Sequence, residues 1–67
     1  MRRRFKPGDT AWLITDESIF GFIVQGVEVK FIDENEFISC VDIMGESHNQ
    51  NDLYKTYELA YKDFIPF

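Results

Sequence analysis

The alternation of side chains from Ile19 to Ile32 is the feature that most constrains the fold. Five apolar residues fall at odd positions, whereas Glu28 and Lys30 fall at even positions; the five are Ile19, Ile23, Val27, Val29 and Phe31. Successive side chains of a strand point to opposite faces, so a period of two predicts a half-buried β-strand. Gly21 and Gly26 interrupt the run, and glycine inside a strand often marks a bulge or a sharp bend. We therefore expect one long strand that bends.

Two more strands are predicted at residues 10–15 and 36–44, which are rich in β-branched and aromatic side chains and too short for helices. The polar residues Asp33, Glu34 and Asn35 form the turn before the second of these strands, with Asn35 suited to a left-handed conformation. The strands on the two sides of this turn should pair as an antiparallel hairpin. Weaker signals predict short strands at 47–50 and 53–55.

The C-terminal residues favour a helix. Thr56 is a suitable N-cap, and the helix should run from Tyr57 to about Phe64, with Pro66 helping to end it. A helix of about two turns is not stable alone in water, so it must pack on the strands.

The bent strand needs a cover, because Phe20 and Phe22 are apolar on the face opposite to Ile19 and Ile23. A strand that is apolar on both faces must be buried on both faces. We expect the C-terminal helix to cover Phe20 and Phe22, with Phe64 packed against them. The same helix should also reach Trp12.

The chain has 67 residues and one cysteine, Cys40, which excludes a disulfide framework and a second domain. We expect a basic N-terminal tip at residues 1–6 and a single domain at residues 7–67, with the helix from about residue 57. No apolar run approaches the ~20 residues that span a bilayer. The chain begins with Met and shows no export signal, so we expect a complete, cytoplasmic product that does not bind membranes.

Charge is unevenly distributed along the chain. Arg2, Arg3, Arg4 and Lys6 are all basic, whereas from Pro7 onward three basic residues face twelve acidic ones, a formal charge of −9. An acidic body repels a phosphate backbone, so nucleic-acid binding is disfavoured. Two alternatives stay open: weak nucleic-acid binding through the four basic residues of the tip, and an acidic decoy that mimics phosphates. The simplest interpretation of the tip is a solvated terminus.

Residues 5–13, FKPGDTAWL, resemble the opening of many SH3-like small barrels, including Tudor-type and KOW-type domains. Gly26 and Val27, followed by a hairpin, resemble the bent second and third strands of such barrels. Residues 53–60, LYKTYELA, are similar to the ending of small bacterial and phage-type proteins. The resemblance implies a mainly β fold: a small antiparallel SH3-like barrel of four or five strands with one short C-terminal α-helix. The proline-binding stretch of the signalling SH3 domains is absent, so the ligand stays open.

Catalytic and metal chemistry have little support in the sequence. Cys40 and His48 are the only candidates for a nucleophile with an activating base. However, Cys40 is predicted to be a small buried apolar group, and His48 is predicted to be solvated. No third residue is identifiable that would orient His48. One His and one Cys fall short of a zinc site, and residues 33–36 lack the glycine of a calcium loop. We expect no enzyme activity, no metal and no cofactor.

Eleven of the 67 residues are aromatic, more than a core of this size needs. Aromatic side chains at a surface give a large contact area at a low cost in entropy. We therefore predict a small non-catalytic module, a monomer or weak homodimer, that binds a protein or peptide through an aromatic patch or a barrel edge. If Ala11 and Leu13 point inward, Trp12 faces outward, unless the helix buries it. The candidate partner-binding residues are Trp12, Phe20, Phe22, Tyr54 and Tyr61.

Overall fold

The computed structural model describes residues 3–64 and contains six strands, one 3₁₀ turn and one helix. Their bounds are β1 Thr10–Ile14, β2 Ile19–Ile23, β3 Gly26–Ile32, β4 Asn35–Val41, β5 Ser47–Asn49, η1 Gln50–Asp52, β6 Leu53–Tyr54 and α1 Tyr57–Asp63. Every segment predicted to be extended contains a strand. The prediction of one long bent strand is wrong, because two residues outside any strand separate β2 from β3 and the two strands belong to different sheets. The 3₁₀ turn η1 was not predicted.

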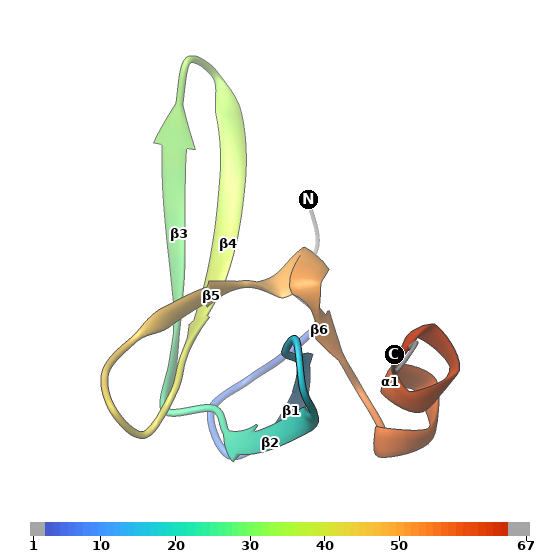
Figure 1. Cartoon of the computed structure of the whole chain (residues 1–67). Helices are drawn as coiled ribbons and strands as arrows, with labels where there is room; N and C mark the ends of the chain where they lie inside the picture. Colours follow the sequence, from blue (N-terminus) through green and yellow to red (C-terminus); the bar gives the residue numbers. More distant parts are fainter. Residues whose placement is uncertain (1–2, 65–67) are drawn as a thin grey trace.

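The strands form two antiparallel sheets, with orders β2-β1-β6 and β3-β4-β5. β6 returns from the end of the chain to pair with β1, at Trp12 and Leu13. The mainly β class with one C-terminal helix is therefore as predicted, but the described residues contain six strands and not four or five. The described strands do not close into one barrel, because no strand ladder joins the two sheets. Figure 1 shows β3 and β4 extending as an arm away from the rest of the molecule.

The core lies between the two sheets. Ala11 and Phe22 come from the first sheet and Cys40 from the second, and all three are buried in one apolar cluster. Phe5 and Val24, which lie outside the strands, complete the cluster together with Leu53. The prediction that Cys40 is a buried apolar group is confirmed, since its side chain is fully buried. Within the predicted tip, Arg3, Arg4 and Lys6 are exposed as expected, whereas Phe5 is buried in the core.

The turn of the β3–β4 hairpin is shorter than predicted. Ile32 pairs with Asn35, so only Asp33 and Glu34 form the loop, and both have positive φ, 49° and 71°. Two left-handed residues are what a type I′ hairpin turn requires. Asn35 lies in β4 and not in the left-handed position that its residue type favours. The hairpin itself is confirmed.

The helix α1 begins as predicted, since the Thr56 side chain accepts a hydrogen bond from the backbone N–H of Leu59. It packs on β1, β2 and β6. The prediction that it covers Phe20 and Phe22 is wrong. These residues pair with Leu13 and Ala11, on the face of the first sheet that meets the core, whereas α1 contacts Trp12 on the opposite face.

No helix in residues 3–64 is both long enough and apolar enough to cross a membrane.

Candidate functional site

The five aromatic residues predicted to bind a partner do not form one patch. Trp12 and Tyr54 are cross-strand neighbours on the face of the first sheet that α1 covers, and Tyr61 lies on α1 itself. Phe20 and Phe22 lie on the other face: Phe22 is 4% exposed in the core, whereas Phe20 is 49% exposed beside it. The structure therefore brings Trp12, Tyr54 and Tyr61 to one side of the molecule and leaves Phe20 and Phe22 on another.

An aromatic surface made of Trp12, Tyr57 and Tyr61 runs from the first sheet onto the helix. The Tyr57 ring meets the Trp12 ring edge-on with 5.5 Å between centroids, and it stacks on Tyr61 at 6.0 Å. The spacing of four residues places Tyr57 and Tyr61 on one face of α1. Tyr57 is 43% and Tyr61 61% exposed. A shallow hollow of about 320 Å³ lies over this part of the helix, bordered also by Glu58 and Lys62.

Trp12 is half-buried because the helix lies over one side of it and Gly21 under the other. Gly21 is the cross-strand partner of Trp12, and its missing side chain leaves room for the indole. A Cβ at Gly21 would come within 2.6 Å of the Trp12 ring. The alternative that the helix partly buries Trp12 is therefore confirmed.

Tyr54 connects the sheet to the helix. Its hydroxyl donates a hydrogen bond to Oδ2 of Asp63 at 2.7 Å. This bond, more than the partial burial of the ring, raises the pKa of Tyr54 above its usual value. Because the phenol keeps its proton at neutral pH, the bond to the Asp63 carboxylate is present under ordinary conditions.

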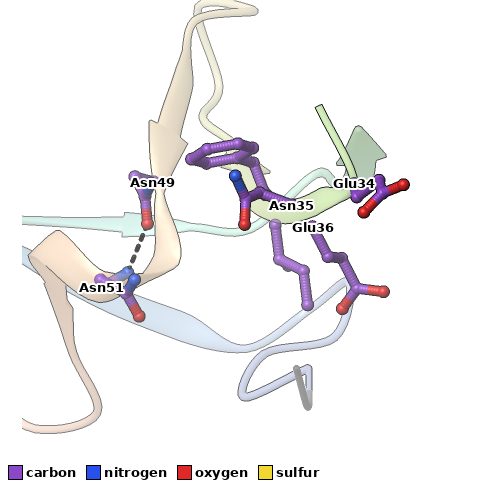
Figure 2. A pocket seen from close by; sticks show the side chains of 7 residues that line it. Glu34, Asn35, Glu36, Asn49 and Asn51 are labelled. Atoms are coloured by element: carbon purple, nitrogen blue, oxygen red, sulfur yellow. Dashed lines mark hydrogen bonds between the residues drawn. The ribbon is translucent and has the colours of Figure 1, made fainter. Parts of the chain in front are cut away.

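A groove of about 460 Å³ lies beside β4. It is bordered by residues 34–38, from the hairpin turn into the strand, and by Asn49 and Asn51. Figure 2 shows the amides of Asn49 and Asn51 on one side of it, facing Asn35 and Glu36 on the other. Asn49 is held in place because its Oδ1 accepts a hydrogen bond from the backbone N–H of Asn51. Amides and carboxylates of this kind can bind a cation or a polar backbone. Neither the Cys40 thiol nor the His48 imidazole lines the groove.

The N-terminal basic residues are joined by a lysine from the other end of the chain. Arg3, Arg4, Lys6 and Lys55 border a hollow of about 340 Å³. We name these four residues the basic cluster. Of the predicted nucleic-acid-contacting residues, Arg2 lies outside the described residues.

Arg4 and Lys55 hold this segment on the body of the protein. Arg4 donates hydrogen bonds from its backbone N–H to Gln50 and from its guanidinium to Asn51 at 2.9 Å. The Lys55 ammonium donates to the carbonyl of Arg4 and lies 4.4 Å from the centre of the Phe5 ring. It also lies 3.8 Å from Asp9, which lowers the net positive charge of the cluster.

Cys40 and His48 are direct cross-strand partners, although the sequence places them eight positions apart. Asp42 is the third residue that sequence reasoning did not find: its Oδ2 accepts a hydrogen bond from Nε2 of His48 at 2.7 Å. The prediction that His48 is solvated is wrong, since its ring is half-buried and lies against Phe22. Burial raises the pKa of the Cys40 thiol, so at neutral pH the group is neither ionised nor accessible.

Asp42 also organises the loop between β4 and β5. Its Oδ1 accepts hydrogen bonds from the backbone N–H groups of Met44 and Glu46. The ligand atoms of Asp42, Glu46 and His48 lie within 4.8 Å of one another, a set that sequence reasoning missed. The atoms of Asp42 and His48 that would bind a metal are joined to each other by a hydrogen bond, and the loop and strand contacts account for their positions.

Comparison with known proteins does not assign a family. The chain matches no protein-family model, no curated protein and no solved structure. The candidate site is therefore defined by the geometry of the described residues alone.

The Asp42–His48 pair should make the stability of the protein depend on pH in the acidic range. The hydrogen bond from His48, followed by those from Glu46 and Met44, lowers the pKa of Asp42 below its usual value. Its contribution to stability is full above the pKa of the unfolded chain and is lost as pH falls from about 5 through the lower, folded pKa. We expect the urea midpoint to fall over this range, and to fall less in Asp42→Asn. Parallel pH profiles for the two proteins would contradict this assignment.

Proposed function

We propose that this protein is a small, non-catalytic interaction module that binds a peptide segment of a partner protein through its aromatic surface. One observation carries the proposal. Tyr57 and Tyr61 stack on each other and are exposed to solvent, and Tyr57 also packs against the half-buried Trp12 ring. Tyrosine and tryptophan dominate binding energy at protein interfaces because they are large, rigid and amphipathic. A surface already in its binding conformation also loses little entropy when it binds.

The border of the aromatic surface indicates the chemistry of the partner. Glu58 and Lys62 place one acidic and one basic side chain beside the apolar hollow. A peptide that fits would present a proline or an aromatic side chain to Tyr57 and Tyr61, flanked by charges of either sign. Such a contact is small, so we expect weak, reversible binding of the kind found in transient interactions.

The non-catalytic part of the proposal is supported by the surroundings of Cys40. The thiol is fully buried and protonated, and His48 donates to Asp42 and forms no hydrogen bond to the sulfur among the described contacts. A nucleophile needs both an activating base and access for its substrate. The aromatic surface itself is lined by phenols and an indole, with no pair of carboxylates.

The SH3-like relationship is also proposed. β2 and β3 follow each other closely and each belongs to a different sheet, as one bent strand of a small barrel would. The last strand, β6, returns to pair with the first. These connections support a small barrel-like ancestry for a fold whose described strands form two separate ladders.

A displayed library of random short peptides, selected on the immobilised protein, tests the function. We expect selected peptides to be rich in proline or aromatic residues, and Tyr61→Ala to weaken their binding at least tenfold in fluorescence anisotropy, because an anchor residue contributes about 2 kcal/mol or more. Tyr61→Ala should leave the urea midpoint nearly unchanged, since the side chain is 61% exposed.

Met44→Ala is the matched control, because it removes an apolar side chain that is 82% exposed in the β4–β5 loop, away from the aromatic surface. It should leave binding unchanged. Recovery of no peptide, or of peptides that bind Tyr61→Ala as tightly as the unmodified protein, would refute the proposal.

A further inference from the structure

The strand β3 is an open edge of the second sheet. It pairs with β4 on one side and has no strand on the other among the described residues. Figure 1 shows it on the outside of the hairpin arm, away from the helix and the first sheet. Proteins usually protect such edges, because an unpaired row of backbone N–H and C=O groups is a template for another strand.

The hydrogen-bond pattern identifies the groups that point outward. The carbonyl of Val41 accepts a bond from Gln25, so Val41 directs its backbone groups toward β3. Backbone direction alternates along a strand, so every second residue of β4 does the same, and their partners Gly26, Glu28, Lys30 and Ile32 point back toward β4. The backbone groups of Val27, Val29 and Phe31 therefore point to the open side.

Charge selects one of the three antiparallel registers that centre the pair of edges on residue 28, 29 or 30, in the middle of β3. Outward-pointing residues must face each other, so the central pair joins two equivalent residues. Centring on residue 28 places Glu28 against Glu28 of the second copy, and centring on residue 30 places Lys30 against Lys30. Centring on Val29 instead places Glu28 of each copy against Lys30 of the other. Opposite charges directly across a sheet stabilise pairing and like charges oppose it.

The same register also matches the two faces of the strand. On one face, Phe31 of each copy lies against Val27 of the other, on either side of the central Val29 pair. This contact would cover Phe31, which is 71% exposed at the tip of the arm. On the opposite face lie the two Glu28–Lys30 pairs. Lys30 forms no ion pair within the described residues, and Glu28 accepts one hydrogen bond from Ser47.

We propose that two copies of this protein associate through β3, antiparallel and centred on Val29, to form a two-fold symmetric dimer with one continuous sheet. The contact uses the hairpin arm and leaves the aromatic surface on the first sheet free. The dimer should be weak, because a single strand from each copy forms the interface and each copy carries a net charge of −5.

Sedimentation velocity over a range of protein concentrations tests the proposal. The unmodified protein should pass from monomer to dimer, and Lys30→Glu should weaken association at least tenfold, since it places two glutamates against two glutamates. Glu28→Lys should do the same with lysines. An equimolar mixture of these two variants should recover the dimer, because each glutamate then faces a lysine.

Three controls separate this interface from other causes. Ser47→Ala removes the hydrogen bond to Glu28 within the chain and should leave association unchanged. Tyr61→Ala should also leave it unchanged, which separates a failure here from a failure of the aromatic surface. Circular dichroism checks that each charge variant is folded, and hydrogen exchange of the Val29 and Phe31 amides should slow as the dimer forms.

The proposal is overturned if the unmodified protein stays monomeric up to its solubility limit. A dimer that Lys30→Glu leaves intact would equally overturn it, as would a mixture of the two charge variants that does not associate.

Discussion

Phe22→Ala should lower the free energy of unfolding by about 3–5 kcal/mol, the usual cost of removing a buried phenylalanine. Phe22 is 4% exposed and is the only aromatic residue of a strand within the core cluster of the described residues. It lies between the two sheets and also supports the ring of His48 at 5.3 Å. Small domains have a total stability of roughly 5 kcal/mol, so the variant should be largely unfolded without a stabilising solute. Urea unfolding followed by Trp12 fluorescence measures the difference.

Phe20→Ala is the control for this prediction. Phe20 lies on the same strand and the same face, two residues away, but is 49% exposed. Its truncation should cost less than half as much as that of Phe22. Equal losses in the two variants would show that the helix or another element covers Phe20 in solution, and would contradict the core described above.

Gly21→Ala should destabilise the protein by about 1–3 kcal/mol, the range for inserting a methyl group where no space exists. The new Cβ would lie 2.6 and 2.8 Å from two carbons of the Trp12 ring. These distances are too short, so either the ring or the backbone at residue 21 must move. Because the same ring contacts Tyr57, its displacement should loosen α1 as well. Urea unfolding gives the loss of stability, and the amide hydrogen exchange of α1 reports the loosening.

Gly26→Ala is the matched glycine control. No heavy atom lies within 4 Å of a Cβ at Gly26, so the substitution should be nearly neutral. In a Trp12→Ala background, Gly21→Ala should lose most of its cost, because the clash has gone. A Gly21→Ala protein as stable as the unmodified one would show that the indole is not seated over Gly21.

The strands and the helix were predictable because their signals are local. The alternation before the hairpin, and the Thr56 cap, depend on residues close together in the sequence. Which element covers each face of the first sheet could not be predicted in this way, because it depends on the register between strands that are distant in the sequence. The pairing of Trp12 with Gly21 decides that the helix packs on the indole, and no local pattern contains that pairing.

For the candidate site, the sequence indicated which types of residue form it, but not how they are arranged. Aromatic abundance predicted a binding surface that includes Trp12 and Tyr61. The structure connects these two residues through Tyr57, which the prediction omitted. The spacing of four residues between Tyr57 and Tyr61 was a usable signal, once the helix had been predicted. The partnership of His48 with Asp42 had no comparable signal, because it depends on the loop that joins β4 to β5.

The central position of β1 has a consequence for synthesis on the ribosome. β1 lies near the start of the chain and pairs on one side with β2, which is made soon after it, and on the other with β6. The hairpin of β3 and β4 needs only neighbouring residues and can form early. The first sheet stays incomplete until residues 53 and 54 have left the exit tunnel, and Trp12 has no cover until α1 follows. Trp12 of a growing chain therefore stays exposed until residues 53–63 are free to fold back onto β1.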